Sequence, residues 1–387
     1  MLNRIKHTLL KVKSRLQENS LDSLVWLVNI VPSRAGFSIL QDKISAPFWI
    51  LHLSLLLYVY GVGSAVFQAK YAQGAGDFIK SYVNISILAL TANNSYWFLK
   101  KRPLLRTVLT MVKQSDVLSR ETVILREKHE KSMSVIKKIL FIFYGFNLMD
   151  AMFIYLPHRT DITNNNFSMT PCVGLEPLSS TPNHQICVAI LATQELTIMT
   201  VVLNYQALLL FFIAHTAVMY DIMSVEIQMF EDKDNLPNLD NMVKERLPIL
   251  IKRHALILDI INNFKYLYSV PLGVNFGSNA VCISFFFFLP LQEWVPFIPI
   301  LIYCFLVFFL YCFLCQRLIN AAEEFERAVY SCGWENFKTK DQKTVYVMLM
   351  QAQKPIVLLA ADIIPVNIYT FATTLQAMYK FITVVKV

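Results

Sequence analysis

Charged residues are scarce in this chain of 387 amino acids. Only 16% of its residues are Asp, Glu, Lys or Arg, whereas 55% are hydrophobic, and the mean hydropathy is +0.46. Soluble globular proteins carry about 25% charged residues, so the composition excludes that class and indicates a membrane protein. The net charge of +8 is therefore not read as nucleic-acid binding, because we expect it to meet anionic lipid headgroups.

The motifs of common enzymes and cofactor-binding proteins are also missing. The sequence contains no Walker loop, no glycine-rich dinucleotide pattern, no nucleophile elbow and no zinc signature. We therefore predict no enzymatic activity, no metal site and no cofactor. His52 and His215 are isolated within apolar stretches and are predicted to be core residues, because no Cys or carboxylate stands near them at metal-ligand spacing.

Seven apolar stretches run through the chain, and most reach the length of about 20 residues that a spanning helix needs. They cover residues 47–69, 78–99, 139–157, 187–221, 267–291, 296–316 and 362–385. Of the 35 Lys and Arg residues, 30 fall in alternate connecting segments, beginning with the N-terminal one. Basic residues stay on the cytoplasmic side. The sequence therefore predicts an all-α membrane protein with seven transmembrane helices, a cytoplasmic N-terminus and an extracellular C-terminus.

This pattern divides the chain into four parts. We expect a cytoplasmic N-terminal segment (1–46), six transmembrane helices (47–316), a cytoplasmic segment (317–361) and a last transmembrane helix (362–387). The inner connecting segments carry apolar residues at helical spacing. They can lie as amphipathic helices on the inner leaflet, or extend below the bilayer and pack into a cytoplasmic base. Three inner segments share the pattern, which favours the second arrangement.

The predicted outer segment 158–186 has features of an extracellular environment. Asn166 begins an Asn-Phe-Ser glycosylation sequon, so we predict it to be a glycan acceptor. Cys172 and Cys187 lie in or beside the same segment and can form a disulfide, although spacing alone does not establish the required geometry. Near the outer ends of two spans, Asp150 and Glu195 are either functional intramembrane acids or residues that reach the interface.

The last apolar stretch has one polar side. At 3.6 residues per turn, that side collects Tyr369, Thr373, Gln376, Lys380, Thr383 and Val387. A membrane helix cannot turn such a stripe toward lipid without a large cost. Two explanations remain: a hydrogen-bonded seam between helices, or the wall of an ion path that copies of this helix build around a symmetry axis. The second explanation requires an oligomer.

Several short runs near the C-terminus resemble the insect odorant receptor family. These runs are Ala321-Ala322-Glu323-Glu324, Ala328-Val329-Tyr330-Ser331 with Trp334, Gln353-Lys354-Pro355, and Phe371, Leu375 and Tyr379-Lys380-Phe381. Chain length, seven spans and an inner N-terminus agree with the same family. The related gustatory receptors carry Thr-Tyr, five residues and Gln-Phe in the last span. Here Leu375 stands at the glutamine position and Gln376 follows one residue late, which favours the odorant branch.

This resemblance implies an odorant-gated, non-selective cation channel in the plasma membrane of olfactory sensory neurons. Subunits that recognise odorants assemble in this family as heterotetramers with a shared co-receptor, and the last helix of each subunit lines the pore. The matching pore positions are Gln376, Lys380, Thr383 and Val387. The chain lacks the enlarged second cytoplasmic loop of co-receptors, so it resembles a tuning subunit.

The resemblance also implies an odorant pocket in the outer half of the bundle, among the second, third, fourth and sixth spans. The expected pocket residues are Tyr82, Ile85, Ser86, Asn147, Asp150, Ala151, Ile154, Gln194, Ile198, Val201, Ile302 and Tyr303. Their largely apolar character suits a small volatile ligand. The alternatives are a gustatory-type channel of the same superfamily and a seven-helix receptor that signals through G proteins. The second requires an extracellular N-terminus, and its acidic-Arg-Tyr and Asn-Pro-x-x-Tyr motifs are absent from the expected positions.

Overall fold

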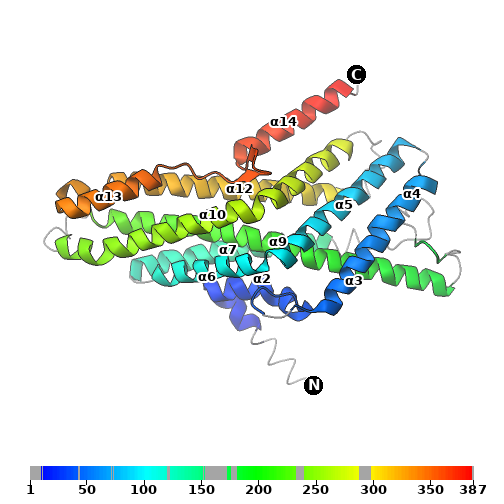
Figure 1. Cartoon of the computed structure of the whole chain (residues 1–387), viewed down its shortest axis with the longest axis horizontal. Helices are drawn as coiled ribbons and strands as arrows, with labels where there is room; N and C mark the ends of the chain where they lie inside the picture. The colour runs from blue at the N-terminus through cyan, green and yellow to red at the C-terminus, as the bar shows by residue number, and fades with distance from the viewer. Residues whose placement is uncertain are drawn as a thin grey trace.

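A computed structural model of the chain describes residues 10, 12–41, 44–70, 72, 74–119, 123–150, 152, 172–175, 181–231, 239–286 and 298–385. Most of these residues are helical. The helices are α2 (Leu21–Ala35), α3 (Ala46–Leu56), η1 (Leu57–Gly63), α4 (Ser64–Lys70), α5 (Ala75–Lys100), α6 (Arg102–Leu118), α7 (Val123–Asp150), α9 (Thr181–Gln228), α10 (Leu239–Phe286), α12 (Ile298–Tyr330), η5 (Trp334–Asn336), α13 (Thr339–Ala352) and α14 (Ile368–Val385). Strands β1 (Leu359–Ala360) and β2 (Ile364–Pro365) pair antiparallel. Figure 1 shows an elongated bundle from which α14 projects.

The described part of each predicted span is largely helical. The first span comprises α3, the π-helical segment η1 and α4, and the others fall on α5, α7, α9, α10, α12 and α14. Within the described residues, four helical stretches are long and apolar enough to cross a membrane: Ala46–Lys70, Leu125–Met149, Pro182–Gln228 and Leu301–Asn336. Helices α5 and α10 are not among these four stretches, and buried asparagines make both of them more polar. The count of seven spans and the orientation of the termini stay predictions.

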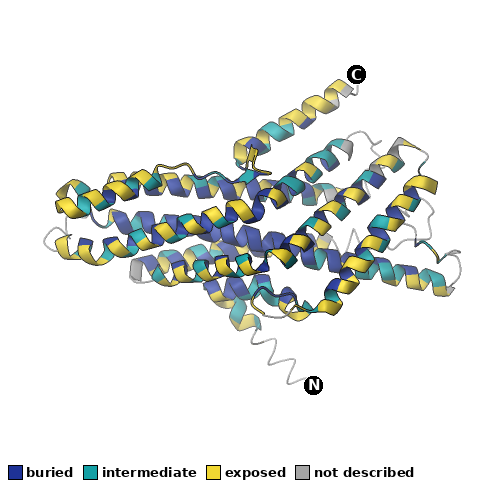
Figure 2. Ribbon diagram, viewed as in Figure 1, coloured by how far each residue is buried: buried dark blue, intermediate teal, exposed yellow. Residues whose placement is uncertain are grey.

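Two helices are far longer than a bilayer is thick. Both α9 and α10 contain 48 residues, which corresponds to about 72 Å, whereas the hydrocarbon core measures about 30 Å. Beyond the spanning part, α9 and α10 pack with α6, α7 and α12. Figure 2 shows α9 as the most deeply buried helix, in the centre of the bundle. The predicted inner segments are thus helices packed in the bundle, and their position relative to a membrane stays a prediction.

We call this packed end the base and define it by the buried residues Asp116, Glu226, Arg253 and Phe325. Arg253 of α10 donates to the carboxylate of Glu226 on α9. His215 does not stand alone, contrary to the sequence-based expectation: its Nε2 lies 3.3 Å from the carboxylate of Asp116, and Nε2 of His129 lies 2.5 Å from the same oxygen. Burial alone would raise the pKa of Asp116, but the hydrogen bonds from the two histidines outweigh it and hold this pKa below its usual range.

The last helix begins later than the apolar stretch. The predicted helix at 362 is replaced by the β1–β2 hairpin, and α14 starts at Ile368. Two residues of the hairpin, Ala361 and Asp362, have positive φ angles of 52° and 58°, which a right-handed helix does not permit. Asn367 then caps α14, because its side-chain oxygen accepts the backbone N–H of Thr370 at 2.8 Å.

The hairpin is fastened to α10. The backbone N–H of Ala361 donates to the carbonyl of Ser269 at 2.7 Å. One turn further along α10, a side chain at Gly273 would place its Cβ only 2.6 Å from the Cβ of Ala361. This close approach explains why a glycine stands at position 273.

Candidate functional site

A cavity of about 140 Å³ lies between α5, α7, α9, α10 and α12. Its lining is mainly apolar. The lining residues are Val83, Ser86, Ile87, Leu90, Thr91, Asn147, Glu195, Ile198, Met199, Val202, Leu203, Ser278, Asn279, Cys282, Tyr303 and Cys304. Apolar walls with a few polar groups are characteristic of a small-molecule site.

Several polar groups around the cavity are hydrogen-bonded to other side chains, two of them across helices. The hydroxyl of Tyr60 on η1 donates to the carboxylate of Glu195 at 2.5 Å, and both side chains are buried. Tyr303 of α12 donates to Gln206 of α9 at 2.8 Å. Asn279 donates to Asn275 one turn away at 2.7 Å. These bonds fix the positions of the polar groups and leave little freedom to the walls.

Two polar atoms in the lining residues have no hydrogen-bond partner in the described part of the chain. One is the side-chain oxygen of Asn147, whose amide nitrogen donates to the carbonyl of Phe143 at 2.6 Å. The other is the hydroxyl of Thr91. Both residues are at least nine-tenths buried. A buried acceptor without a partner costs about 1–3 kcal/mol, and a ligand that donates a hydrogen bond removes this cost.

The structure brings some of the expected pocket residues together at this cavity. Ser86, Asn147, Ile198 and Tyr303 line it. Gln194 and Val201 are buried outside the lining, Tyr82 is half-buried, and Ile85 and Ile302 are 48% and 43% exposed. The side chain of Asp150 and the whole of Ala151 and Ile154 lie outside the described residues, as does Asn166. The assignment of individual ligand contacts stays a prediction.

Helix α10 contributes to the cavity, which the sequence did not predict. Ser278, Asn279 and Cys282 of this helix line the cavity. Asn275, Asn279 and Cys282 follow one another at spacings of four and three residues, which places them on one helix face. That polar face within an apolar stretch was visible in the sequence and indicates contact with protein or a cavity. Glu195, which the sequence left open as a functional acid or a residue that reaches the interface, also lines the cavity and is the one Asp, Glu, Lys or Arg among the described lining residues.

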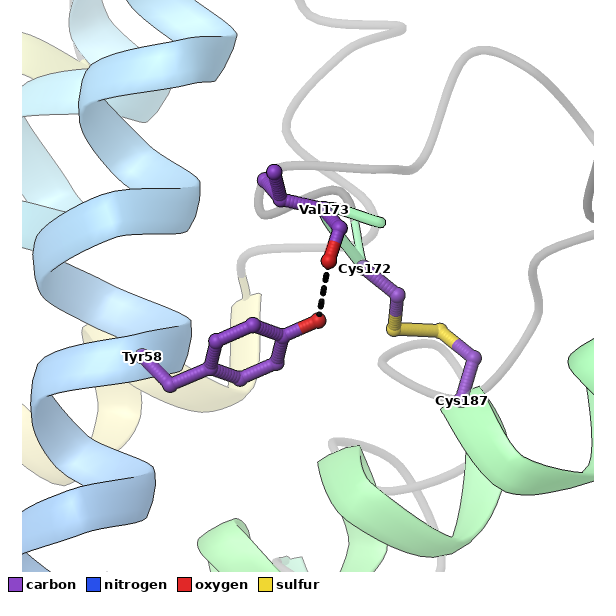
Figure 3. The surroundings of a disulfide bond; sticks show 4 residues. All are labelled: Tyr58, Cys172, Val173 and Cys187. Carbon is purple, nitrogen blue, oxygen red and sulfur yellow. Dashed lines mark hydrogen bonds between the residues drawn. A yellow bond between two sulfur atoms is a disulfide. The ribbon is translucent and has the colours of Figure 1, made fainter. Parts of the chain in front are cut away.

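A disulfide-linked segment lies beside the cavity. Cys172 is bonded to Cys187 of α9, with their Cα atoms 5.8 Å apart. Figure 3 shows Tyr58 of η1 next to this bond, and its hydroxyl donates to the carbonyl of Val173 at 2.9 Å. Both cysteines belong to a buried cluster that includes the cavity residues Leu90, Ile198 and Val202. The disulfide therefore ties the segment 172–175 to the wall of the cavity.

Helix α14 exposes its polar side. Phe371, Leu375 and Met378 pack against α12, whereas Tyr369, Gln376, Lys380 and Thr383 are exposed. The side chains of Gln376 and Lys380 make no hydrogen bond or ion pair with any described residue, and Thr383 donates only to the carbonyl of Lys380. The polar stripe thus forms no seam within the described part of this chain. Val387 lies outside the described residues.

Comparison with known proteins connects this architecture with a receptor family. Residues 77–379 match the family described as 7tm Odorant receptor. Among curated proteins of Drosophila melanogaster, Odorant receptor 10a is 26% identical over 189 residues, which cover 45% of this chain and 46% of the relative. Odorant receptor 56a is 27% identical over 143 residues, which cover 35% and 34%. The chain thus spans less than half the length of these relatives.

The fold is similar to that of a solved receptor. The insect olfactory receptor OR5 from Machilis hrabei has a TM-score of 0.78 and 12% sequence identity, with 92% of this chain and 96% of that chain covered. The same receptor in complex with eugenol has a TM-score of 0.77 and 13% identity, with coverages of 94% and 97%. Because the family match extends over most of the sequence, the chain belongs to the insect odorant receptor family.

Proposed function

We propose that the chain is a tuning subunit of an odorant-gated, non-selective cation channel in the plasma membrane of olfactory sensory neurons, where it assembles with a shared co-receptor. The observation that carries this proposal is the combination of a largely apolar cavity with a polar, exposed last helix. Family membership supports the receptor role, and the two structural features supply a binding site and a candidate pore wall.

The cavity has the size of a small volatile molecule. Its volume of about 140 Å³ is close to that of an engineered protein cavity of about 150 Å³ that binds benzene. Burial of the ligand's apolar surface contributes about 25 cal/mol per Å², which is the main source of affinity in such a site. The similar insect receptor was solved with eugenol, which supports a compact aromatic or aliphatic odorant here.

The polar lining favours an odorant with one hydroxyl group. An alcohol or phenol can donate to the free side-chain oxygen of Asn147, and its own oxygen can accept from the hydroxyl of Thr91. An ether or a hydrocarbon satisfies no acceptor and leaves Asn147 unbonded. We therefore expect hydroxyl compounds to activate the receptor at lower concentrations than methyl ethers or hydrocarbons of the same shape.

The cavity and the last helix share a wall. Tyr303 and Cys304 line the cavity, and the same pair belongs to the cluster in which Leu375 and Met378 of α14 pack against α12. A ligand that binds more tightly when this wall is displaced shifts the population toward the displaced state. Movement of α12 is then transmitted directly to α14, without an intervening loop.

Assembly gives the polar stripe of α14 its role. One helix cannot enclose a pore, so copies of α14 from several subunits surround an axis and turn Gln376, Lys380, Thr383 and Val387 toward it. Residues 317–361 form the anchor where subunits meet. In support, α13 exposes Tyr346, Val347 and Met350 by 59%, 56% and 51%, and such an apolar surface is typical of a protein contact.

Electrical recording tests the function. Cells that express this chain and a co-receptor should show a cation current when a small alcohol or phenol is applied, and the current should persist when G-protein signalling is blocked. No current in response to any compound of a broad volatile panel, despite surface expression of both chains, would overturn the proposal. Loss of the current on the G-protein block would favour a metabotropic receptor.

Substitution in α14 separates permeation from binding. Gln376→Leu should change the relative permeability of monovalent and divalent cations, because it removes a polar group from the pore wall, while the odorant concentration for half-maximal current stays within about threefold. Phe381→Leu is the matched control, since Phe381 is exposed on another side of the same helix. Equal effects of both substitutions on permeability would contradict the pore-lining role.

A further inference from the structure

A second cavity, of about 470 Å³, is lined by α2, the helical residues before it, Leu40 and one residue of α6. The lining residues are Val12, Arg15, Asp22, Val25, Trp26, Asn29, Ile30, Ser33, Arg34, Leu40 and Lys113. Neither the predicted pore nor the odorant site uses any of them.

The charge of this cavity is positive. Arg15, Arg34 and Lys113 contribute three cationic groups, against the single carboxylate of Asp22. Arg15 has only a loose ion pair with Glu18, at 3.9 Å between exposed side chains. The side chains of Arg34 and Lys113 form no ion pair with any residue that the structure describes. These cations are therefore available to an anionic ligand.

Two other arginines, Arg102 and Arg106, already hold the segment that follows α2. Arg102 of α6 donates to the carbonyl groups of Ser38 and Gln41, and Arg106 donates to that of Ile39 at 3.0 Å. The segment after α2 is thus already fastened to α6 by two other basic residues. Arg34 and Lys113 add positive charge to the cavity without forming such ties.

The cavity lies close in the sequence to the start of a candidate membrane span. Leu40 lies six positions before Ala46, the first residue of a candidate membrane span. Trp26 is half-buried in the cavity wall, and tryptophan is enriched at membrane–water interfaces. Val12, Ile30 and Leu40 provide apolar surface next to the cations. This mixture matches a molecule with a charged head and an apolar body.

We propose that this cavity binds the phosphorylated headgroup of an anionic membrane lipid. Arginine guanidinium groups bind phosphate oxygens with paired hydrogen bonds, and Arg15 and Arg34 supply two such groups while Lys113 adds a point charge. The side chains of Asn29 and Ser33 line the same cavity and can donate to further phosphate or hydroxyl oxygens. The apolar part of the lining contacts the glycerol and the first acyl carbons, which a soluble phosphate lacks.

Reconstitution tests the lipid site. The full chain is placed in nanodiscs of phosphatidylcholine with or without phosphatidylinositol 4,5-bisphosphate, and retained lipid is measured by native mass spectrometry. Each basic residue near a membrane surface strengthens binding about fivefold, so Arg34→Gln/Lys113→Gln should weaken retention of the phosphorylated lipid about 30-fold. An unchanged melting temperature of the variant shows that the fold is intact.

A second variant separates the site from general surface charge. Lys131→Gln/Lys244→Gln removes two exposed cations of α7 and α10 that lie outside the cavity, and its retention should match the wild type within about twofold. An equal loss in this variant would overturn the site. Inositol trisphosphate serves as the soluble probe; if it competes as strongly as the lipid itself binds, the ligand is a free phosphate ester and the lipid assignment fails. These measurements use no odorant, so their outcome is independent of the proposed channel activity.

Discussion

In the base, buried charged groups face one another at hydrogen-bond distance, whereas around the odorant cavity buried polar atoms remain without partners in the described chain. Asp116 lies against two histidines and Glu226 against Arg253. Asn147 and Thr91, in the cavity lining, each have a free side-chain oxygen. Among the described residues the base also contains buried polar atoms without a hydrogen-bond partner, at Ser115 Oγ and His254 Nε2, so its paired charges are what distinguish it. Paired buried charges hold one arrangement, whereas unpaired polar atoms beside a cavity can gain by binding a ligand. We therefore expect a rigid base and a responsive cavity.

Removal of one ion-pair partner should break the base. Glu226→Leu leaves Arg253 fully buried without its carboxylate, and loss of one partner of a buried pair costs about 3–5 kcal/mol. We expect a large fall in the melting temperature of the purified protein and poor surface expression. The double variant Glu226→Leu/Arg253→Met should recover most of this stability, since a buried pair replaced by apolar residues is close to neutral. If the double variant is as unstable as the single one, the pair is not what holds α9 to α10.

Acidification should weaken the base through His254. This residue of α10 is 3% exposed and contacts Tyr220 and Phe325, and burial lowers its pKa from 6.5 to about 4. The unfolded chain therefore binds this proton at a higher pH than the folded chain, so stability is complete above pH 6.5 and falls as the pH drops toward 4, by about 3 kcal/mol. His254→Phe should flatten this part of the pH profile of unfolding. A profile unchanged by the substitution would show that other groups dominate.

A methyl group at position 273 should loosen the link between the bundle and the last helix. Gly273→Ala brings its Cβ into overlap with Ala361, and such overpacking costs about 1–3 kcal/mol. Because Ala361 belongs to the hairpin before α14, we expect altered opening and closing of the channel with little change in odorant affinity. Gly277→Ala is the matched control on the same helix, since no atom lies within 4 Å of its added Cβ. Equal currents from both variants would contradict a role of the hairpin contact.

Replacement of Asn147, the free acceptor in the cavity, should have the smallest effect of these substitutions. Asn147→Leu removes the oxygen that we assign to the ligand's hydroxyl, so phenol should lose about tenfold in potency, equivalent to about 1.4 kcal/mol. Toluene, which has the same ring without the hydroxyl, should keep or gain potency. Concentration–response curves for the two compounds on the same variant provide the comparison, and parallel losses for both would indicate that Asn147 only shapes the cavity.

The helices of the bundle were predictable from the sequence because apolar composition is a local property. The start of α14 was not, because positive φ angles at Ala361 and Asp362 arise from packing of the hairpin on α10. The contact of His215 with Asp116 joins residues 99 positions apart, which no spacing rule detects. The cavity lining depends on how each helix is rotated about its axis. For that reason Ile85, an expected pocket residue, is exposed, whereas Val83, which the sequence did not single out, lines the cavity.

The π-helical segment η1 determines how the first span presents its two inward tyrosines. Tyr58 reaches the disulfide-linked segment and Tyr60, only two residues on, reaches Glu195. A π turn accommodates an extra residue in the helical repeat. Deletion of one residue between Leu57 and Gly63 would therefore restore a regular α-helical repeat, while the residues after Gly63 keep the side that they face now. The same deletion in a regular α-helix would rotate the following residues by about 100°, so the π-helical segment is a place where the helix can gain or lose one residue without losing its packed face.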